Sequence, residues 1–128
     1  MDDVAVLKKV IEKDSRYSLD AYLFVFEAIF YTRKKFRVEG HVTGQQLLEG
    51  IKELVLERYG LMAKAVLEHW GIKETLDFGN IVFNMVSEKI LGKTEEDSLD
   101  DFKDIYDFDE VFVKNYQLAV KRSAHGKS

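Results

Sequence analysis

The chain has 128 residues, enough for one compact domain, and 46% of them are hydrophobic, which supports a real core and excludes a disordered tail. Its 19 basic and 23 acidic residues give a net charge of −4, which disfavours nucleic acid as a partner because such binding relies on an excess of cations. Cysteine is absent, so disulfides and cysteine-built metal centres are excluded, and the absence of proline leaves helices uninterrupted.

Apolar residues recur at helical spacing along almost the whole chain, and no repeat or low-complexity segment interrupts them. This periodicity predicts helices over residues 4–13, 19–36, 43–59, 61–70, 75–91 and about 98–112. Only residues 37–42 could form a short strand. The sequence therefore predicts an all-α fold, a compact single-domain bundle of five to six helices over residues 1–120, followed by a disordered tail over residues 121–128.

The ends of several expected helices carry residues that favour capping. Thr43 and Gln46 have the spacing of a capping box, in which each side chain binds the backbone N–H of the other residue. Ser98 and Asp101 have the same spacing, and Thr75 is expected to cap the helix that follows. Four glycines are expected at helix ends, namely Gly60, Gly71, Gly79 and Gly92.

The N-terminus is acidic and is soon interrupted by Lys8 and Lys9, unlike a secretory signal, which has a basic start and a longer apolar core. The densest apolar run, residues 21–31, would reach about 16 Å as a helix, roughly half the hydrocarbon thickness of a membrane. We therefore expect a cytoplasmic protein without a membrane span. Abundant Lys and Glu with few Asn and Gln favour a thermophilic source.

Acidic residues are concentrated in one segment, because nine of the residues from Glu95 to Glu110 are acidic, against a single basic residue, Lys103. The segment lacks the central glycine and the closing glutamate of a calcium-binding loop, and its apolar residues keep helical spacing. We interpret it as a solvated helix face that a basic protein partner binds in a salt-sensitive manner.

No motif indicates catalysis, a cofactor or a metal centre. The three histidines are far apart and form none of the paired spacings that metal centres use. The DFG tripeptide at residues 77–79 is unaccompanied by any other kinase motif. Residues 61–85 have the outline of a helix-turn-helix, but the second helix would present acidic and amide side chains to DNA phosphates, which makes DNA binding unfavourable.

Glu27 is the most unusual single residue, because the positions three and four away along its helix are all apolar or aromatic. A carboxylate in such surroundings is expected to be protonated or paired, and we predict Arg16, His41 or Tyr22 as its partner. Two interpretations stay open, a buried polar contact that fixes helix register and a carboxylate that binds a ligand or takes part in catalysis.

Several strings occur in order along the chain, including DSRY at 14–17, HVTGQQLLEG at 41–50, HWGI at 69–72, TLDFGNIVFN at 75–84, EDS at 96–98 and YDF at 106–108. Together they resemble a family of small bacterial proteins that share a conserved domain without an assigned activity. The resemblance covers about residues 13–112. It implies a single cytoplasmic domain and supplies no cofactor, activity or catalytic residue.

Some of the matched residues have no evident structural role, namely Arg16, Tyr17, His41, Gln45 and Asp77. We expect any site to lie where the start of the 19–36 helix approaches the turn at His41, with the N-terminus of the 43–59 helix receiving an anion. The candidate ligand-binding residues are therefore Arg16, Tyr17, Glu27, His41 and Gln45.

Three functions follow from these patterns. The first is a small soluble protein-interaction module that binds its partner through Glu95–Glu110. The second is a small-ligand-binding protein or an enzyme that uses Arg16, Glu27 and His41. The third is a nucleic-acid-associated, helix-turn-helix-like protein, which the charge distribution disfavours.

Overall fold

The computed structural model of the chain describes residues 3–92 and 98–125. Over these residues the structure is helical and has no strand, which confirms the predicted all-α class. The helices are α1 (Asp3–Lys13), α2 (Leu19–Phe36), α3 (Gly44–Tyr59), α4 (Ala63–His69), α5 (Thr75–Ser87) and α6 (Asn115–His125). Three short helical turns accompany them, namely η1 (Gly60–Met62), η2 (Leu99–Phe102) and η3 (Asp109–Lys114).

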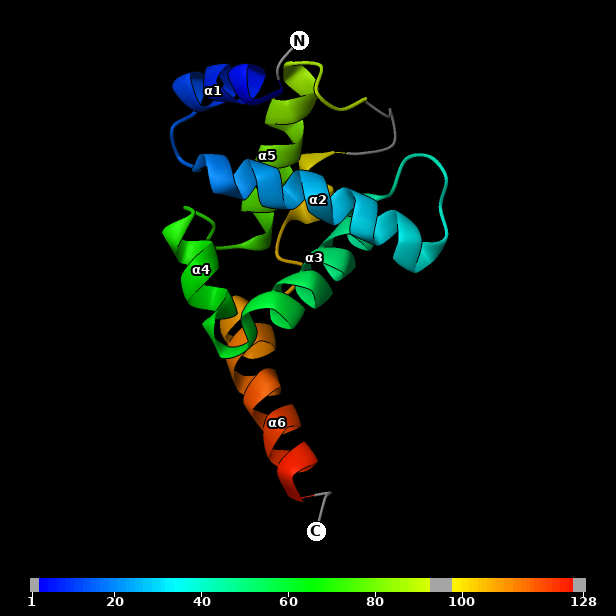
Figure 1. Cartoon of the computed structure of the whole chain (residues 1–128), viewed down its shortest axis with the longest axis vertical. Helices are drawn as coiled ribbons and strands as arrows, with labels where there is room; N and C mark the ends of the chain where they lie inside the picture. Colours follow the sequence, from blue (N-terminus) through cyan, green and yellow to red (C-terminus); the bar gives the residue numbers. More distant parts are fainter. Residues whose placement is uncertain (1–2, 93–97, 126–128) are drawn as a thin grey trace.

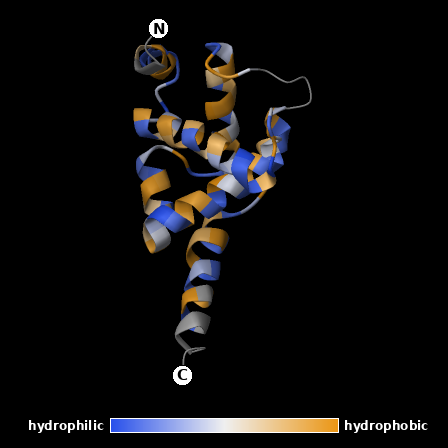
Figure 2. Ribbon diagram, turned by 45° about the vertical axis from the view of Figure 1, so that its right-hand side comes forward, coloured by the Kyte–Doolittle hydropathy of each residue, from blue (hydrophilic) through white to orange (hydrophobic). Residues whose placement is uncertain are grey.

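The helix α2 lies across the middle of the molecule, with α1 on one side and α3 on the other, while α5 runs steeply across it (Figure 1). α5 contacts α1, α2 and α3, so one core joins these four helices. α6 extends away from this body toward the C-terminus (Figure 1), and Figure 2 shows the same projection from another side. None of the helices in the described ranges combines the length and the apolar character needed to span a bilayer.

The helices α2 and α3 approach each other closely at Gly50. A Cβ atom on Gly50 would lie 1.9 Å from Oγ1 of Thr32, so the Thr32 side chain or one of the helices would have to shift. Thr32 is fully buried, and its hydroxyl donates to the carbonyl of Ala28 at 2.7 Å. Because Gly50 has no side chain, the backbone of α3 packs directly against the Thr32 side chain of α2. Leu48 and Ile51, near Gly50 in α3, are fully buried.

The predicted bounds of α2 and α3 are close to those observed, because local capping determines where both helices begin. Ser18 caps α2, and Thr43 caps α3 in the predicted capping box with Gln46. In that box the Gln46 N–H donates to Thr43 Oγ1 at 3.1 Å, and the Thr43 N–H donates to Gln46 Oε1 at 3.0 Å. Gly60 ends α3 as predicted, with a φ of 50° that glycine adopts easily.

The helix α5 starts and ends differently from the prediction. Glu74, and not Thr75, is its N-cap, and the Thr75 hydroxyl instead donates to the Phe102 carbonyl at 2.5 Å. The helix ends at Ser87 and does not continue to Gly92, because Lys89 is left-handed at a φ of 62°. The following N–H of Ile90 returns to the Met85 carbonyl at 2.8 Å, which is the usual closing bond of such a helix end.

The acidic segment does not form the continuous helix that its periodicity predicts. Ser98 and Asp101 form the expected capping box, but the helical turn that they begin, η2, ends at Phe102. Lys103 is extended and Asp104 is left-handed at a φ of 51°, so the chain changes direction before η3 begins. Residues 95–97, which also belong to the predicted acidic surface, lie outside the described residues.

Phe102 attaches η2 to the body by filling the space beside two glycines. A Cβ on Gly79 would lie 2.8 Å from Cγ of the Phe102 ring, and a Cβ on Gly44 would lie 3.1 Å from the ring edge. Gly79 lies inside α5 and not at the helix end where we predicted it. Its role is to admit the ring of a residue from a distant part of the chain.

The C-terminal end is more regular than predicted. α6 continues to His125, so residues 121–125, where the sequence predicts a disordered tail, have a helical backbone. Residues 126–128 lie outside the described part of the chain. Residues 37–42, the one candidate strand, form the irregular connection between α2 and α3.

Candidate functional site

A polar network joins the connection between α1 and α2 to α5. Tyr17 is buried, and its hydroxyl donates to Asp77 Oδ1 while it accepts from Asn80 Nδ2 at 3.0 Å. The other oxygen of Asp77 accepts the backbone N–H groups of Lys73 and Glu74, at 2.8 and 3.1 Å. Burial, helped by the hydrogen bond to the Asp77 carboxylate, raises the pKa of Tyr17 well above its usual range. The hydroxyl is therefore a permanent donor at neutral pH.

A second branch of this network is centred on Asp14. Arg16 donates to it through Nε at 2.9 Å and Nη2 at 2.7 Å, a two-pronged pair. Asn84 Nδ2 donates to Asp14 Oδ2 at 2.9 Å and to the Tyr22 hydroxyl at 3.0 Å. The hydrogen bonds from Arg16 hold the pKa of Asp14 far below its usual range, and burial raises the pKa of Tyr22. Asp14 is therefore charged and Tyr22 neutral at physiological pH.

The network is complete without a ligand. Across the described residues, no buried side-chain nitrogen or oxygen lacks a hydrogen-bond partner. The backbone is equally close-fitting here, since a Cβ on Gly71, at a φ of 92°, would lie 2.0 Å from the Arg16 carbonyl oxygen. The Ser18 N–H also donates to the Trp70 carbonyl at 3.1 Å. Arg16, Tyr17 and several other residues of the sequence strings that carry the family resemblance thus meet at one structural junction.

This junction also covers the helix face that a helix-turn-helix protein would turn toward DNA. Asp77, Asn80 and Asn84 share one face of α5, and the α1–α2 connection lies against that face through Tyr17 and Asp14. A helix-turn-helix protein would instead expose these side chains to DNA. Their engagement inside the protein weakens the nucleic-acid hypothesis further.

Glu27 is exposed, contrary to the prediction that it enters an apolar environment. Its side chain is 52% exposed and pairs with Arg58 of α3, which replaces the predicted Arg16, His41 or Tyr22. Both terminal nitrogens of Arg58 donate to the carboxylate, Nη1 at 2.7 Å. These hydrogen bonds lower the pKa of Glu27.

The prediction fails because the face of α2 around Glu27 is turned to solvent. Leu23 and Phe30, its neighbours four and three residues away, are 43% and 49% exposed. Phe30 packs instead against Phe26 and under the guanidinium of Arg33, whose carbon lies 5.3 Å from the ring centre. Apolar neighbours along one helix therefore do not imply burial of the residue between them.

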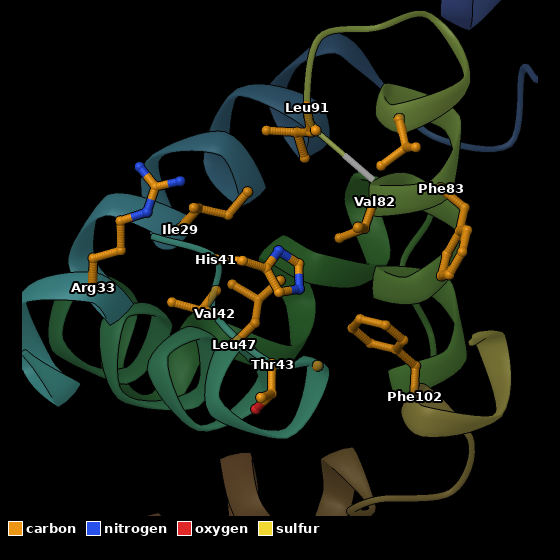
Figure 3. Close-up of a pocket in the computed structure, with 13 residues that line it drawn as sticks. Ile29, Arg33, His41, Val42, Thr43, Leu47, Val82, Phe83, Leu91 and Phe102 are labelled. Carbon is orange, nitrogen blue, oxygen red and sulfur yellow. The ribbon is translucent and has the colours of Figure 1, made fainter. Parts of the chain in front are cut away.

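An apolar pocket opens between α2, the start of α3 and α5 (Figure 3). Its wall is mostly aliphatic and aromatic, formed by Ile29, Val42, Leu47, Val82, Phe83, Val86, Leu91 and Phe102. Polar side chains of Arg33, His41 and Thr43 complete it, with Arg33 at the edge beside Ile29 (Figure 3). The hollow has a volume of about 580 Å³ when the space at its open mouth is included.

The structure does not unite the residues predicted to form one site. Arg16 precedes α2 and His41 follows it, and a helix of 18 residues is about 27 Å long, so α2 separates them. Arg16 and Tyr17 belong to the polar junction, Glu27 to a surface ion pair and His41 to the pocket. Gln45 is an exposed residue in the first turn of α3.

A second hollow, of about 690 Å³ including open space, lies beside residues 104–110 and the start of α5. Its lining is acidic and contains Lys73, Glu74, Asp104, Asp107 and Glu110. Ile105, Tyr106 and Phe108 provide apolar surface within it, and Ile105 is 41% exposed. We call this surface the acidic hollow.

The backbone of the acidic hollow is held in place by two contacts to the body. The Ile105 N–H donates to Thr75 Oγ1 at 3.1 Å, and the Tyr106 hydroxyl donates to the Leu48 carbonyl at 2.8 Å. Burial raises the pKa of Tyr106 far above its usual range, so this hydroxyl stays a donor. The carboxylates at the rim are thus carried by a fixed loop.

Some residues of these sites are absent from the sequence-based candidates. Asn80 and Asn84 hold the junction, and Phe102 closes the pocket wall. The signal for the two asparagines is their spacing, since Asp77, Asn80 and Asn84 are three and four residues apart and share a helix face. No local pattern identifies Phe102, because its partners are two glycines far away in the sequence.

No protein-family model matches the chain, and neither a curated protein nor a solved structure matches it. The resemblance to a family of small bacterial proteins therefore stays an expectation drawn from the sequence strings.

Proposed function

We propose that this protein is an interaction module that binds a basic segment of a partner protein in the acidic hollow. One observation carries the proposal: Glu74, Asp104, Asp107 and Glu110 surround partly exposed apolar surface at Ile105. Lys73 is the one basic side chain in the lining formed by the described residues.

The composition of the hollow indicates the partner's chemistry. Four carboxylates against one ammonium group attract a segment that carries several lysines or arginines, and they accelerate its association. The exposed side chain of Ile105 offers an apolar contact for a residue between those cations. Because the loop is already fixed by its hydrogen bonds to Thr75 and Leu48, little conformational entropy is lost on binding.

The test is a binding measurement with a fluorescent peptide in which lysines and arginines flank a central leucine. The acidic hollow is neutralised by Asp104→Asn, Asp107→Asn and Glu110→Gln together. Asn is well suited to position 104, because Asn tolerates the left-handed conformation that Asp104 adopts. Asp101 and Asp109 are left unchanged, since Asp101 caps η2 and Asp109 pairs with Lys64.

The matched control neutralises three exposed carboxylates outside the hollow, by Glu12→Gln, Asp20→Asn and Glu39→Gln. Both triple variants change the net charge equally, so general electrostatic attraction affects them alike. We expect the peptide to bind wild type and control at low salt, to bind the hollow variant at least about tenfold more weakly, and to dissociate as salt rises. Equal binding by the two triple variants, or no binding by wild type at low salt, contradicts the proposal.

A further inference from the structure

The apolar pocket beside His41 is distinct from the acidic hollow, and the two share none of their described lining residues. Four separate parts of the chain form it, namely α2, residues 41–47 at the start of α3, α5 with the residues after it, and Phe102 of η2. Its inner wall is hydrocarbon, and Val82, Val86 and Phe83 line it without being fully buried. Apolar surface that remains accessible inside a concave wall is typical of a small-molecule site.

Among the described residues, the charge at the edge of this pocket is positive. Arg33 is the one fully charged side chain among the described residues that line it, and none of those residues is acidic. Arg33 donates from Nε to the Gly40 carbonyl at 2.9 Å, which anchors the guanidinium to the α2–α3 connection. Among the hydrogen bonds between described residues, Arg33 uses Nε alone, so no described residue engages its two terminal nitrogens, whose N–H groups can donate to a carboxylate.

Two further features agree with an anion at this edge. α3 begins at the pocket with Thr43 and Gly44, and its first turn carries no acidic side chain. The positive end of that helix adds to the field of Arg33. Figure 3 shows Arg33 at the rim and the aliphatic residues Ile29, Leu47 and Val82 farther inside, so charge and hydrocarbon surface are spatially separated.

From this arrangement we infer that the pocket binds a small monocarboxylate with an apolar tail, such as a medium-chain fatty acid. The carboxylate pairs with the terminal nitrogens of Arg33, and the tail lies against Val82, Val86 and Phe102. The reasoning is independent of the acidic hollow, which attracts the opposite charge.

The experiment measures octanoate binding by calorimetry and by chemical-shift perturbation, with octanol as the neutral ligand of the same tail. Arg33→Gln removes the charge at the rim. Lys34→Gln is the matched control, because it removes one charge from the next residue of α2, which does not line the pocket. Val82→Phe fills the pocket, and its circular dichroism spectrum and melting temperature establish whether it folds.

We expect Arg33→Gln to weaken octanoate binding about tenfold or more, because a hydrogen bond between charged groups is lost, and to leave octanol binding unchanged. Lys34→Gln binds both ligands as wild type does, and folded Val82→Phe binds neither. Across hexanoate, octanoate and decanoate, each methylene group that enters the pocket tightens binding by up to about fourfold.

Three results would overturn the inference: no octanoate binding to wild type at millimolar concentration, equal effects of Arg33→Gln and Lys34→Gln, or perturbed shifts located away from the pocket. If Val82→Phe does not fold, the comparison of Arg33→Gln with Lys34→Gln still decides the question, since neither Arg33, which is half-buried, nor Lys34, which is exposed, belongs to the buried core.

Discussion

Gly50 and Thr32 show how strongly a single residue determines the approach of two helices. Replacing Gly50 by Ala places a methyl group where Thr32 Oγ1 lies, at 1.9 Å from the new Cβ. The helix propensity of Ala favours the variant by about 1 kcal/mol, but overpacking of a buried contact costs about 1–3 kcal/mol and more where the backbone has to move. We expect a net loss of unfolding free energy, measured by urea denaturation.

The control for this substitution is Gly40→Ala in the α2–α3 connection. A Cβ at position 40 would have no atom within 4 Å, so the same chemical change meets open space. We expect its unfolding free energy to stay within about 0.5 kcal/mol of wild type. If Gly50→Ala is as stable as Gly40→Ala, the close α2–α3 contact is not present in solution.

The Tyr17 hydroxyl links the α1–α2 connection to α5, and Tyr17→Phe removes this hydroxyl while keeping the buried ring. Asp77 Oδ1 then loses its donor and Asn80 loses an acceptor. We expect a loss of about 1–3 kcal/mol in unfolding free energy, the usual cost of leaving partly buried polar groups without a partner. Tyr31→Phe is the matched control, because the Tyr31 hydroxyl donates to an exposed carboxylate of Glu53, and its loss should be much smaller. Similar losses in both variants would contradict the assigned role of Tyr17.

Sequence patterns predict the roles of individual residues only partly. Arg16, Tyr17 and Asp77 stand out because they are polar residues without a local role, and the structure gives them a common one. Glu27 fails as a candidate because its burial depends on whether another helix covers that face of α2, and no helix in the described part of the chain does. Periodicity describes the face of a helix but contains no information about its tertiary neighbour.

Whole helices also differ in whether local sequence patterns predict them. α2 and α3 were predictable because their starts depend on Ser18 and Thr43, whose caps lie within three residues of the side chain. The structure of the acidic segment was not predictable, because its helical spacing continues through Asp104, where the backbone is left-handed. Nothing local distinguishes that aspartate, and its conformation follows from the anchoring of Phe102 on one side and Tyr106 on the other.

The projecting helix α6 supports a prediction of its own. Leu118 and Val120 are 52% and 47% exposed, so the side chains that the structure describes beyond the first turn of this helix are little buried. Within that turn the Tyr116 hydroxyl lies beside Gly60. An isolated helix of this length is marginal in water. We expect removal of residues 117–128 to lower the melting temperature by less than about 5 °C.

A longer truncation provides the contrast. Removing residues 111–128 also takes away Phe112, which is fully buried against Tyr106 and Phe108. The loss of a buried aromatic side chain costs about 3–5 kcal/mol, so this variant should melt far earlier. A large drop with the shorter truncation would mean that α6 packs against another surface in solution, including a second copy of the chain.

For the whole molecule, ion-paired carboxylates determine the response to acid. The pKa of Asp14 is lowered mainly by its hydrogen bonds with Arg16, and neighbouring cations also lower the pKa values of Glu53 and Asp109. A carboxyl whose pKa is lower in the folded state stabilises the fold above its unfolded pKa of about 4, and this contribution is lost as the pH falls. We expect the unfolding free energy to decline below about pH 5.

Asp14→Asn tests the largest of these contributions. The variant should be less stable than wild type at neutral pH and should lose less stability between neutral and acidic pH, since the titrating group is gone. Asp20→Asn, at an exposed position, serves as the control and should keep the wild-type profile. Denaturant titrations at several pH values measure the profile, and parallel curves for Asp14→Asn and wild type would contradict the expectation.

The two proposed binding surfaces were less predictable than the helices, because both form where distant segments meet. The acidic hollow was anticipated through its carboxylates, although the apolar surface within it depends on where the chain turns at Asp104. Of the pocket lining, the sequence pointed to His41 and to the N-terminus of the 43–59 helix alone. Its wall combines α2, α3, α5 and Phe102, and no pattern within one helix reveals such a meeting.

The seating of the Phe102 ring against Gly79 and Gly44 has a consequence for how sequences with this fold can diverge. A Cβ at position 79 would lie 2.8 Å from the ring, and one at position 44 would lie 3.1 Å from it. The three positions therefore cannot vary independently. Sequences that keep the aromatic residue should keep glycine strictly at position 79 and less strictly at position 44, whereas sequences with alanine at position 79 should carry a smaller residue at position 102. Such covariation would be an evolutionary imprint of one ring seated between two helices.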